Sequence, residues 1–165
     1  MTESAIVHAE IDSPIGPIHL FANEKGLTGL YMNTHRDALP PAAMLSADQN
    51  LFLSSAAKEL GEYFEGKRKD FSVTLDPHGT QFQMRVWTEL LNIPFGQTIS
   101  YGELAKRLGD PLLTRAVGTA NGQNPISIII PCHRVIGANG HLTGYGGGIE
   151  KKRWLLDHEA EDTLF

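Results

Sequence analysis

The hydrophobic pattern of this chain changes near residue 79, and the change limits the folds that the chain can adopt. Before it, four segments alternate apolar and polar positions between turn sequences, as β-strands do: AIVHAEI, GPIHLFA, GLTGLYM and FSVTL. A helix is expected at residues 48 to 65, with Gly66 as its C-terminal cap, and HRDALPPAAM before it is predicted to be a loop. The turn sequence DPHG marks the boundary. We therefore predict an α/β domain over residues 1–79.

Residues 80–165 are predicted to form a second domain that is mainly helical. Capping boxes that begin at Thr80 and Ser100 each open a helix. A glycine ends the second of these helices, and Asp110 can cap the next one, LLTRAVGTAN. Two short helices joined by a tight glycine-containing turn predict a helix-turn-helix.

The rest of the second domain contains a short apolar segment and a long helix. Residues 126–130, ISIII, are nearly all apolar and are predicted to form a strand that is buried on both faces. Asn139-Gly140 is typical of a hairpin turn, and TGYGGG is typical of a flexible loop. The segment IEKKRWLLDHE is predicted to be the final helix.

The composition is that of an ordinary globular protein, with 41% hydrophobic and 20% charged residues. No segment approaches the roughly 20 apolar residues of a membrane span, and the acidic, polar start is not a secretory signal peptide. The single cysteine excludes an internal disulfide and a multi-cysteine zinc site. We therefore expect a cytoplasmic protein with a reduced thiol, no metal and no membrane partner.

The charge is unevenly distributed along the chain. The net charge is −5, and residues 1–84 contain 6 Lys or Arg against 11 Asp or Glu, whereas residues 85–165 contain 8 of each. A polyanion is therefore expected to bind to the second domain. The small number of basic residues predicts modest affinity and a small salt dependence.

The only cysteine follows an apolar run in the segment IIIPCHRVIG. A single cysteine after a buried strand is usually a small core residue. Here Pro131 forces the chain to turn, and Cys132 follows at the expected strand end. His133 and Arg134 are placed to stabilise a thiolate, which favours a reactive thiol. Zinc deaminases and redox C-x-x-C proteins need a second cysteine where Val135 stands, and papain-like and caspase-like signatures are absent.

The motifs around this thiol match one family. They lie between about residues 80 and 160, and they are SYGELAKRLG, RAVGTANGQNP, NPISIII, PCHRV, TGYGGG and WLLDHE. Together they resemble the O6-alkylguanine-DNA alkyltransferases, also called methylated-DNA–protein-cysteine methyltransferases. The first domain is similar to this family only in pattern, for example in SPIGPIHL. The resemblance implies a ribonuclease H-like α/β domain, followed by a winged-helix-like domain whose helix-turn-helix binds DNA.

The resemblance also implies roles for single residues. Cys132 resembles the nucleophile that takes the alkyl group. His133 resembles the base that removes the thiol proton through a water molecule, and Glu159 the carboxylate that orients this histidine. Asn124 resembles the asparagine that braces the turn before the active-site segment. Tyr101 resembles the tyrosine that contacts the flipped base and a phosphate, and that donates a proton to the departing guanine.

A second group of residues is implied to contact DNA and the base. Arg115 resembles the arginine that enters the base stack. The small residues Gly118, Thr119 and Ala120 would let the helix approach DNA closely. Val135, Tyr145 and Gly146 correspond to the guanine pocket. Some family members have serine where Gly146 stands, so a hydroxyl contact is lost there while the backbone N–H remains.

The resemblance implies a DNA repair enzyme that acts once. It would move an alkyl group irreversibly from O6-alkylguanine in duplex DNA to Cys132, after flipping the nucleotide from the minor-groove side. Activity on O4-alkylthymine is left open. No cofactor is implied, and a monomer is expected in the absence of DNA. The alternative is a non-enzymatic alkylated-DNA recognition protein of the same fold, but such relatives lack the cysteine. A helix-turn-helix regulator and a cysteine hydrolase are further alternatives.

Overall fold

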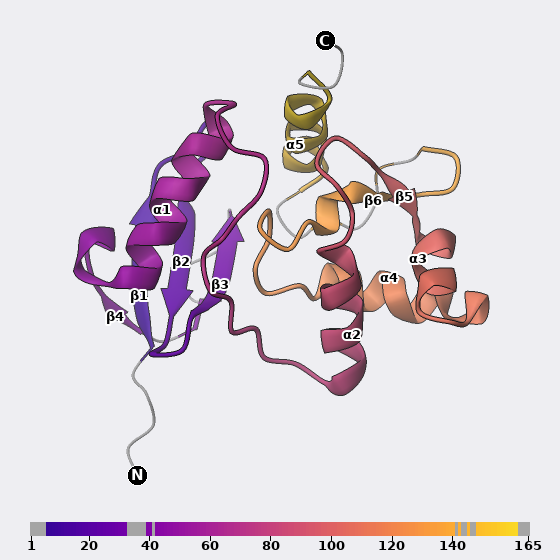
Figure 1. Ribbon diagram of the computed structural model, residues 1–165, viewed down its shortest axis with the longest axis horizontal. Helices are drawn as coiled ribbons and strands as arrows, with labels where there is room; N and C mark the ends of the chain where they lie inside the picture. The colour runs from indigo at the N-terminus through magenta and orange to yellow at the C-terminus, as the bar shows by residue number, and fades with distance from the viewer. Residues whose placement is uncertain are drawn as a thin grey trace. The chain divides into compact units, whose positions relative to one another are not determined.

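The computed structural model describes residues 6–32, 39, 40, 42–140, 142, 145 and 148–161. Two compact units can be recognised in the chain, Met1–His78 and Gly79–Phe165 (Figure 1). Within the described ranges, no helix is both long and apolar enough to cross a membrane.

The first unit contains a four-stranded sheet with the order β3-β2-β1-β4. Three strands run antiparallel at the positions that the alternating pattern predicts: β1 (Val7–Ile11), β2 (Ile18–Ala22) and β3 (Leu27–Met32). The fourth, β4 (Ala43–Met44), pairs parallel with β1 and was not predicted, because it lies in the segment expected to be a loop. Residues 35–38 and 41 of that segment lie outside the described residues.

Helix α1 (Leu51–Phe64) contacts β1, β2 and β3 and lies across the sheet in Figure 1. The side chain of Asn50 caps its first turn by accepting hydrogen bonds from the backbone N–H groups of Phe52 and Leu53. A short 3₁₀ turn, η2 (Ala47–Gln49), precedes it. Gly66 has a φ of 78° just beyond the helix end, which confirms the predicted glycine cap.

The segment FSVTL does not form the predicted strand. The buried carboxylate of Glu59 on α1 accepts hydrogen bonds from the backbone N–H groups of Ser72 and Val73. Only Leu75 makes a bridge, to Leu27, and it is an isolated one. The N–H groups of Ser72 and Val73 are therefore satisfied by a side chain, and only the end of the segment, at Thr74 and Leu75, pairs with the first residue of β3.

The second unit is mainly helical, as the sequence predicts. Its elements are α2 (Gln81–Leu90), β5 (Ile99–Ser100), α3 (Tyr101–Arg107), η3 (Pro111–Leu113), α4 (Thr114–Gly122), η4 (Cys132–Arg134), β6 (Val135–Ile136) and α5 (Ile149–Glu161). Helix α4 contacts both α2 and α3, and the indole N–H of Trp87 donates to the carbonyl of Ala120 across the α2–α4 interface. The parallel pair β5–β6 was not predicted.

The capping predictions are confirmed at two helix starts and half confirmed at a third. Thr80 forms the complete capping box of α2. Asp110 accepts the backbone N–H of Leu112 and so opens η3, which continues into α4. Ser100 caps α3, but the carboxylate of Glu103 lies 3.4 Å from Arg107 and does not return to the cap.

The four isoleucines of residues 126–130 are buried as predicted and Ser127 is half-buried, but the segment does not form a strand. The backbone N–H of Ile129 donates to the carbonyl of Ser127, two residues earlier, with Ile128 between them at a φ of 72°. The N–H of Cys132 donates in the same way to Ile130 across Pro131, whose φ and ψ are −82° and 64°. Both patterns are those of γ-turns, so the apolar run is folded tightly on itself. An all-apolar segment predicts burial, but it does not determine the backbone path.

Candidate active site

Cys132 is the first residue of η4 and is only 5% exposed. The chain reaches it through the two γ-turns of residues 127–132. A positive φ at a β-branched residue such as Ile128 costs about 1–3 kcal/mol and persists only where the surroundings enforce it. Ile128 is itself buried, so its packing holds the turn that leads to the thiol.

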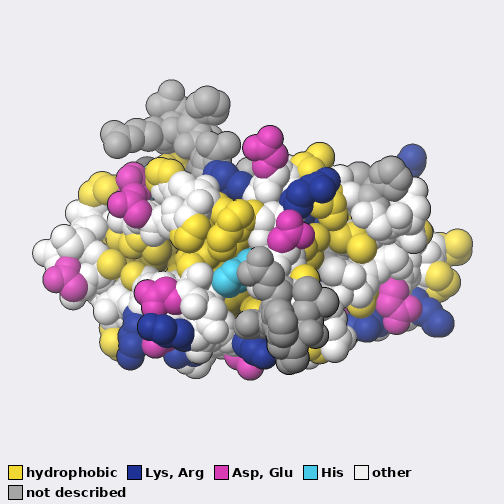
Figure 2. Space-filling model, turned by 90° about the horizontal axis from the view of Figure 1, so that it is seen from above, with side chains coloured by type: hydrophobic (Ala, Val, Ile, Leu, Met, Phe, Trp, Pro, Cys, Tyr) yellow, Lys and Arg dark blue, Asp and Glu magenta, His cyan; other side chains and the backbone are white. Residues whose placement is uncertain are grey.

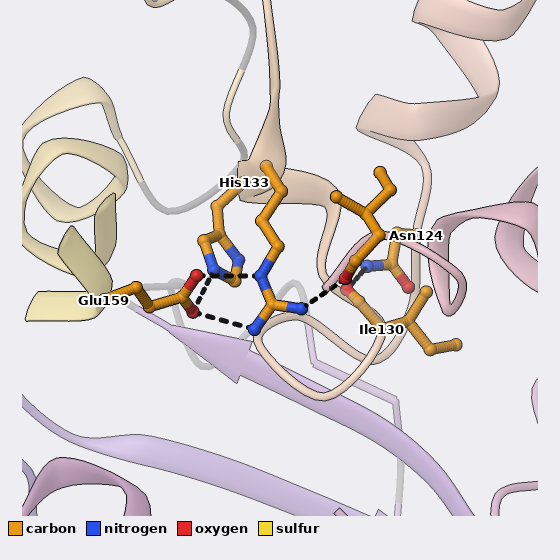
Figure 3. Close-up of polar contacts among 6 residues, drawn as sticks. Asn124, Ile130, His133 and Glu159 are labelled. Carbon is orange, nitrogen blue, oxygen red and sulfur yellow. Dashed lines mark hydrogen bonds and ion pairs between the residues drawn. The ribbon is translucent and has the colours of Figure 1, made fainter. Parts of the chain in front are cut away.

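Asn124 braces this turn with its side-chain amide. Its Oδ1 accepts the backbone N–H of Ile126 at 3.0 Å, and its Nδ2 donates to the carbonyl of Ile130 at 2.7 Å (Figure 3). Asn124 is buried, so these bonds are shielded from competition with water. The amide thus binds backbone groups that a neighbouring strand would bind in a sheet. These bonds are consistent with the bracing role that the resemblance implies.

Burial raises the pKa of the Cys132 thiol above its ordinary value. A hydrogen bond from Asn124 and the positive charge of Lys152 act in the opposite direction. The resting thiol is therefore protonated at neutral pH, and a base must remove its proton before it can act as a nucleophile.

His133 is suited to be that base. Its Nε2 lies 2.7 Å from Oε2 of Glu159, and both side chains are almost completely buried (Figure 3). Burial lowers the pKa of His133, although Glu159 opposes this, so the imidazole is neutral at neutral pH. Because an ionised Glu159 can only accept, Nε2 carries the proton and Nδ1 has a lone pair. This Nδ1 is buried and has no hydrogen-bond partner among the described residues.

Arg134 holds the other side of the same carboxylate. Its Nε donates to Oε1 of Glu159 at 2.7 Å and its Nη2 donates to Oε2 at 3.0 Å, while Nη1 donates to the carbonyl of Ile93. Burial raises the pKa of Glu159, but the hydrogen bonds and charges of His133 and Arg134 outweigh it and hold that pKa far below its ordinary value. Glu159 therefore stays ionised, and it orients the imidazole without taking the proton.

The expectation that Arg134 stabilises the thiolate is wrong. The guanidinium is committed to Glu159, to Ile93 and to the ring of Phe95, 5.8 Å away. The positive charge that lowers the pKa of the Cys132 thiol is that of Lys152.

The predicted pocket residues are only partly described. The side chain of Val135 is fully buried at the start of β6. Burial, followed by the nearby Cys132, raises the pKa of Tyr145 well above its ordinary value, and a hydrogen bond with the side chain of Ser127 acts in the opposite direction. Gly146 lies outside the described residues.

Helix α4 presents the predicted DNA-contacting residues on an exposed face. Arg115 is exposed in its first turn, and Gly118 follows one turn later. A Cβ on Gly118 would meet the ring of Tyr101 at 3.7 Å, so α3 and α4 converge there. Ala120, which we expected to help α4 approach DNA, is instead buried against α2.

Two site residues were not predicted. Lys152 is 1% exposed, and its Nζ donates to the carbonyl of Val135 at 2.7 Å. The Nδ2 of Asn121 donates to the carbonyl of Cys132 at 3.3 Å. A signal for Lys152 was present, because Lys152, Leu155 and Glu159 have the i, i+3, i+7 spacing of one helix face, and all three are buried.

The described residues contain no group of three or more His, Cys, Asp or Glu side chains that could hold a metal ion. The charged and titratable groups described beside the Cys132 thiol include the imidazole of His133, the carboxylate of Glu159 and the cations of Arg134 and Lys152.

Both parts of the chain match models of one family. Residues 6–77 match the ribonuclease-like domain of 6-O-methylguanine DNA methyltransferase, and residues 81–161 match its DNA-binding domain. The resemblance stated from the motifs and the two-part fold class are confirmed by these matches.

Curated relatives and solved structures that resemble this chain come from the same family. The methylated-DNA–protein-cysteine methyltransferase of Mycobacterium tuberculosis is 51% identical over 97% of this chain and 99% of its own length, and that of Methanosarcina acetivorans is 47% identical over 93% and 97%. The crystal structure of the M. tuberculosis O6-methylguanine methyltransferase has a TM-score of 0.86 at 49% identity, covering 94% of this chain and 93% of that one. A structure of M. tuberculosis OGT in complex with DNA has a TM-score of 0.83 at 50% identity, with the same coverage.

These matches extend over nearly the whole chain and include both of its units. The chain therefore belongs to the family of methylated-DNA–protein-cysteine methyltransferases.

Proposed function

We propose that Cys132 accepts the alkyl group when this chain repairs O6-alkylguanine in duplex DNA. Alkyl transfer from DNA to a protein cysteine is the function of the family, and Cys132 is the only cysteine of the chain. The observation that carries the proposal is the imidazole of His133, which follows the thiol directly. It is tied to Glu159 through Nε2 and offers its Nδ1 as a base.

The transfer begins when the Cys132 thiol loses its proton. The thiol proton passes through a water molecule to Nδ1 of His133, and the imidazolium that forms is stabilised by the ionised Glu159. The Cys132 sulfur then forms a bond to the alkyl carbon, while the bond from that carbon to O6 of guanine breaks and leaves its electron pair on the base. Proton donation to the departing guanine is assigned to Tyr101. The thioether product is stable, so each molecule acts once.

The reacting carbon must first leave the base stack. Rotating a nucleotide out of the duplex costs a few kcal/mol, and less for a damaged pair. Arg115 is the residue proposed to fill the vacated space. It is exposed on α4, and none of the described residues forms a hydrogen bond or an ion pair with its side chain.

Minor-groove binding is proposed from the small residues of α4, since a helix with one cation and a glycine suits close, shallow contact more than sequence readout. On the face in Figure 2, basic and acidic side chains are interspersed. Modest affinity for DNA is proposed because Arg115 is the single basic residue of α4. We also propose that the protein is a monomer without DNA and that it works in the cytoplasm, where a thiol stays reduced.

Replacing the acceptor tests this function. Cys132→Ala should fold, should bind duplex DNA with O6-methylguanine as the wild-type protein does, and should take up no labelled methyl group. Transfer of label to this variant would refute the assignment. DNA binding by the wild-type protein without any loss of methyl from the base would instead support a recognition protein without chemistry.

A further inference from the structure

Lys152 is a lysine whose side chain is buried in the interior of the second unit. It lies in the first turn of α5 and is only 1% exposed. Lysine is almost never fully buried unless its ammonium ion has partners. The roles assigned to His133, Glu159 and Arg134 do not require a lysine, so its burial calls for a separate explanation.

Two of the contacts of Lys152 within the second unit show where its ammonium ion lies. Its Nζ donates a 2.7 Å hydrogen bond to the backbone carbonyl of Val135, which belongs to the proposed guanine pocket. The same nitrogen lies 5.9 Å from the centre of the Tyr101 ring, which is within the range of a cation–π interaction. Lys152 therefore connects α5 to the start of α3 and to the strand that follows the thiol.

Lys152 also acts on the thiol electrostatically. Burial lowers the pKa of Lys152, and the negative charge of a Cys132 thiolate opposes this. In turn, burial raises the pKa of the Cys132 thiol, and the positive charge of Lys152 opposes that effect. The titratable groups around Lys152 and the thiol come from four parts of the unit: His133 and Arg134 in η4, Glu159 in α5 with Lys152 itself, Tyr101 in α3, and Tyr145. The Arg134 charge is neutralised by Glu159.

We propose that Lys152 is a positioning residue for alkyl transfer, whose ammonium ion fixes the Val135 carbonyl and provides the positive charge beside which the Cys132 thiolate forms. The inference rests on the proposed function of Cys132 as the alkyl acceptor. It adds a charged group from α5 to the thiol, the imidazole and the carboxylate. When the thioether forms, the sulfur loses its negative charge and Lys152 loses the partner that raised its proton affinity.

The first test separates the charge of Lys152 from its volume. Lys152→Met keeps a long flexible side chain and removes the ammonium ion, and Lys151→Met is the control on the same helix, since Lys151 is partly exposed and does not act on the thiol. Single-turnover rates with O6-methylguanine as the free base are measured across pH. The midpoint of the Lys152→Met profile should move to higher pH, and the rate should recover there. Each pKa unit of displacement lowers the neutral-pH rate about tenfold.

A structural role alone predicts a different profile. If the side chain merely fills space, Lys152→Met should lower the rate by the same factor at every pH. That result would overturn the inference, and so would a profile that matches the Lys151→Met control.

A second measurement needs no variant and covers the case in which Lys152→Met does not fold. The Nζ signals of the wild-type protein are titrated by ¹⁵N NMR before and after one equivalent of O6-methylguanine DNA has been consumed. The pKa of Lys152 should fall on methylation, while that of Lys151 stays constant. If Cys132 is methylated and the Lys152 pKa does not change, this inference is wrong. If Cys132 takes up no methyl group, it is the proposed function that fails.

Discussion

Arg134 and Glu159 form a buried two-point ion pair, with 2.7 Å between Nε and Oε1 and 3.0 Å between Nη2 and Oε2. This pair explains why the carboxylate beside His133 stays charged although it is 1% exposed. Two donors hold Glu159 in the orientation that places Nδ1 of His133 as the proton acceptor.

Glu159→Gln should slow alkyl transfer by roughly 10²-fold, because the imidazolium loses its counter-ion. DNA affinity should change little, and the apparent pKa of the thiol should rise. The variant should also unfold more easily, since removing one partner of a buried ion pair costs about 3–5 kcal/mol. Glu150→Gln, at the exposed start of the same helix, is the control. An unchanged single-turnover rate would remove Glu159 from the mechanism.

The stability of the protein should fall as the pH is lowered. The pKa of Glu159 is depressed by folding from an ordinary value of 4.5, so its contribution is present above that pH and is lost below it. The pKa of His133 is also depressed, from 6.5, so the unfolded chain binds this proton first and stability declines below that pH as well. Denaturant midpoints from pH 8 to pH 4 measure the decline. Below about pH 4.5 the curve should be flatter in Glu159→Gln, and equal slopes would contradict the assignment.

Arg115→Ala should affect the reaction rates of two substrates, duplex DNA and the free alkylated base, differently. Repair of O6-alkylguanine within a duplex should slow strongly, because no side chain fills the stack after flipping. Reaction with the free alkylated base should be nearly unchanged, since no stack has to open. If Arg115 only pairs a phosphate, its loss should instead weaken binding to all DNA and reduce the salt slope by about one. Equal slowing on the duplex and on the free base would exclude the stack-filling role.

Gly118→Ala should stabilise the protein and impair its action on duplex DNA. Alanine is favoured over glycine within a helix by about 1 kcal/mol, and the new Cβ would meet Tyr101 at an ordinary contact distance of 3.7 Å. The added methyl group would, however, stand on the face proposed to approach DNA. Thermal unfolding and duplex repair should therefore change in opposite directions. Wild-type repair by a stabilised variant would show that close approach at Gly118 is not required.

The parts of the fold that the sequence predicted depend on local chemistry. Thr80, Gly66 and Asp110 act through hydrogen bonds or dihedral angles within a few residues of themselves, so their roles are visible in short segments. The proximity of His133 to Glu159 came from the family motif, because 26 residues separate them and no local rule brings them together.

The failures have a common physical cause. The segments FSVTL and ISIII were both expected to be strands, and in both, backbone groups are bound by side chains outside the segment or by tight turns within it. Lys152 was not predicted, because lysine is almost never fully buried. Its spacing from Glu159 nevertheless indicates a shared helix face, since residues seven apart lie on the same side of a helix.

Mass spectrometry of the wild-type protein tests the central claim most directly. The protein is mixed with an excess of duplex DNA containing O6-methylguanine and is then digested. The account predicts one methyl group per molecule, located on the peptide that contains Cys132, and no consumption of a second equivalent. A methyl group on any other residue, continued turnover of the DNA, or an unmodified Cys132 after the base has been repaired would contradict it.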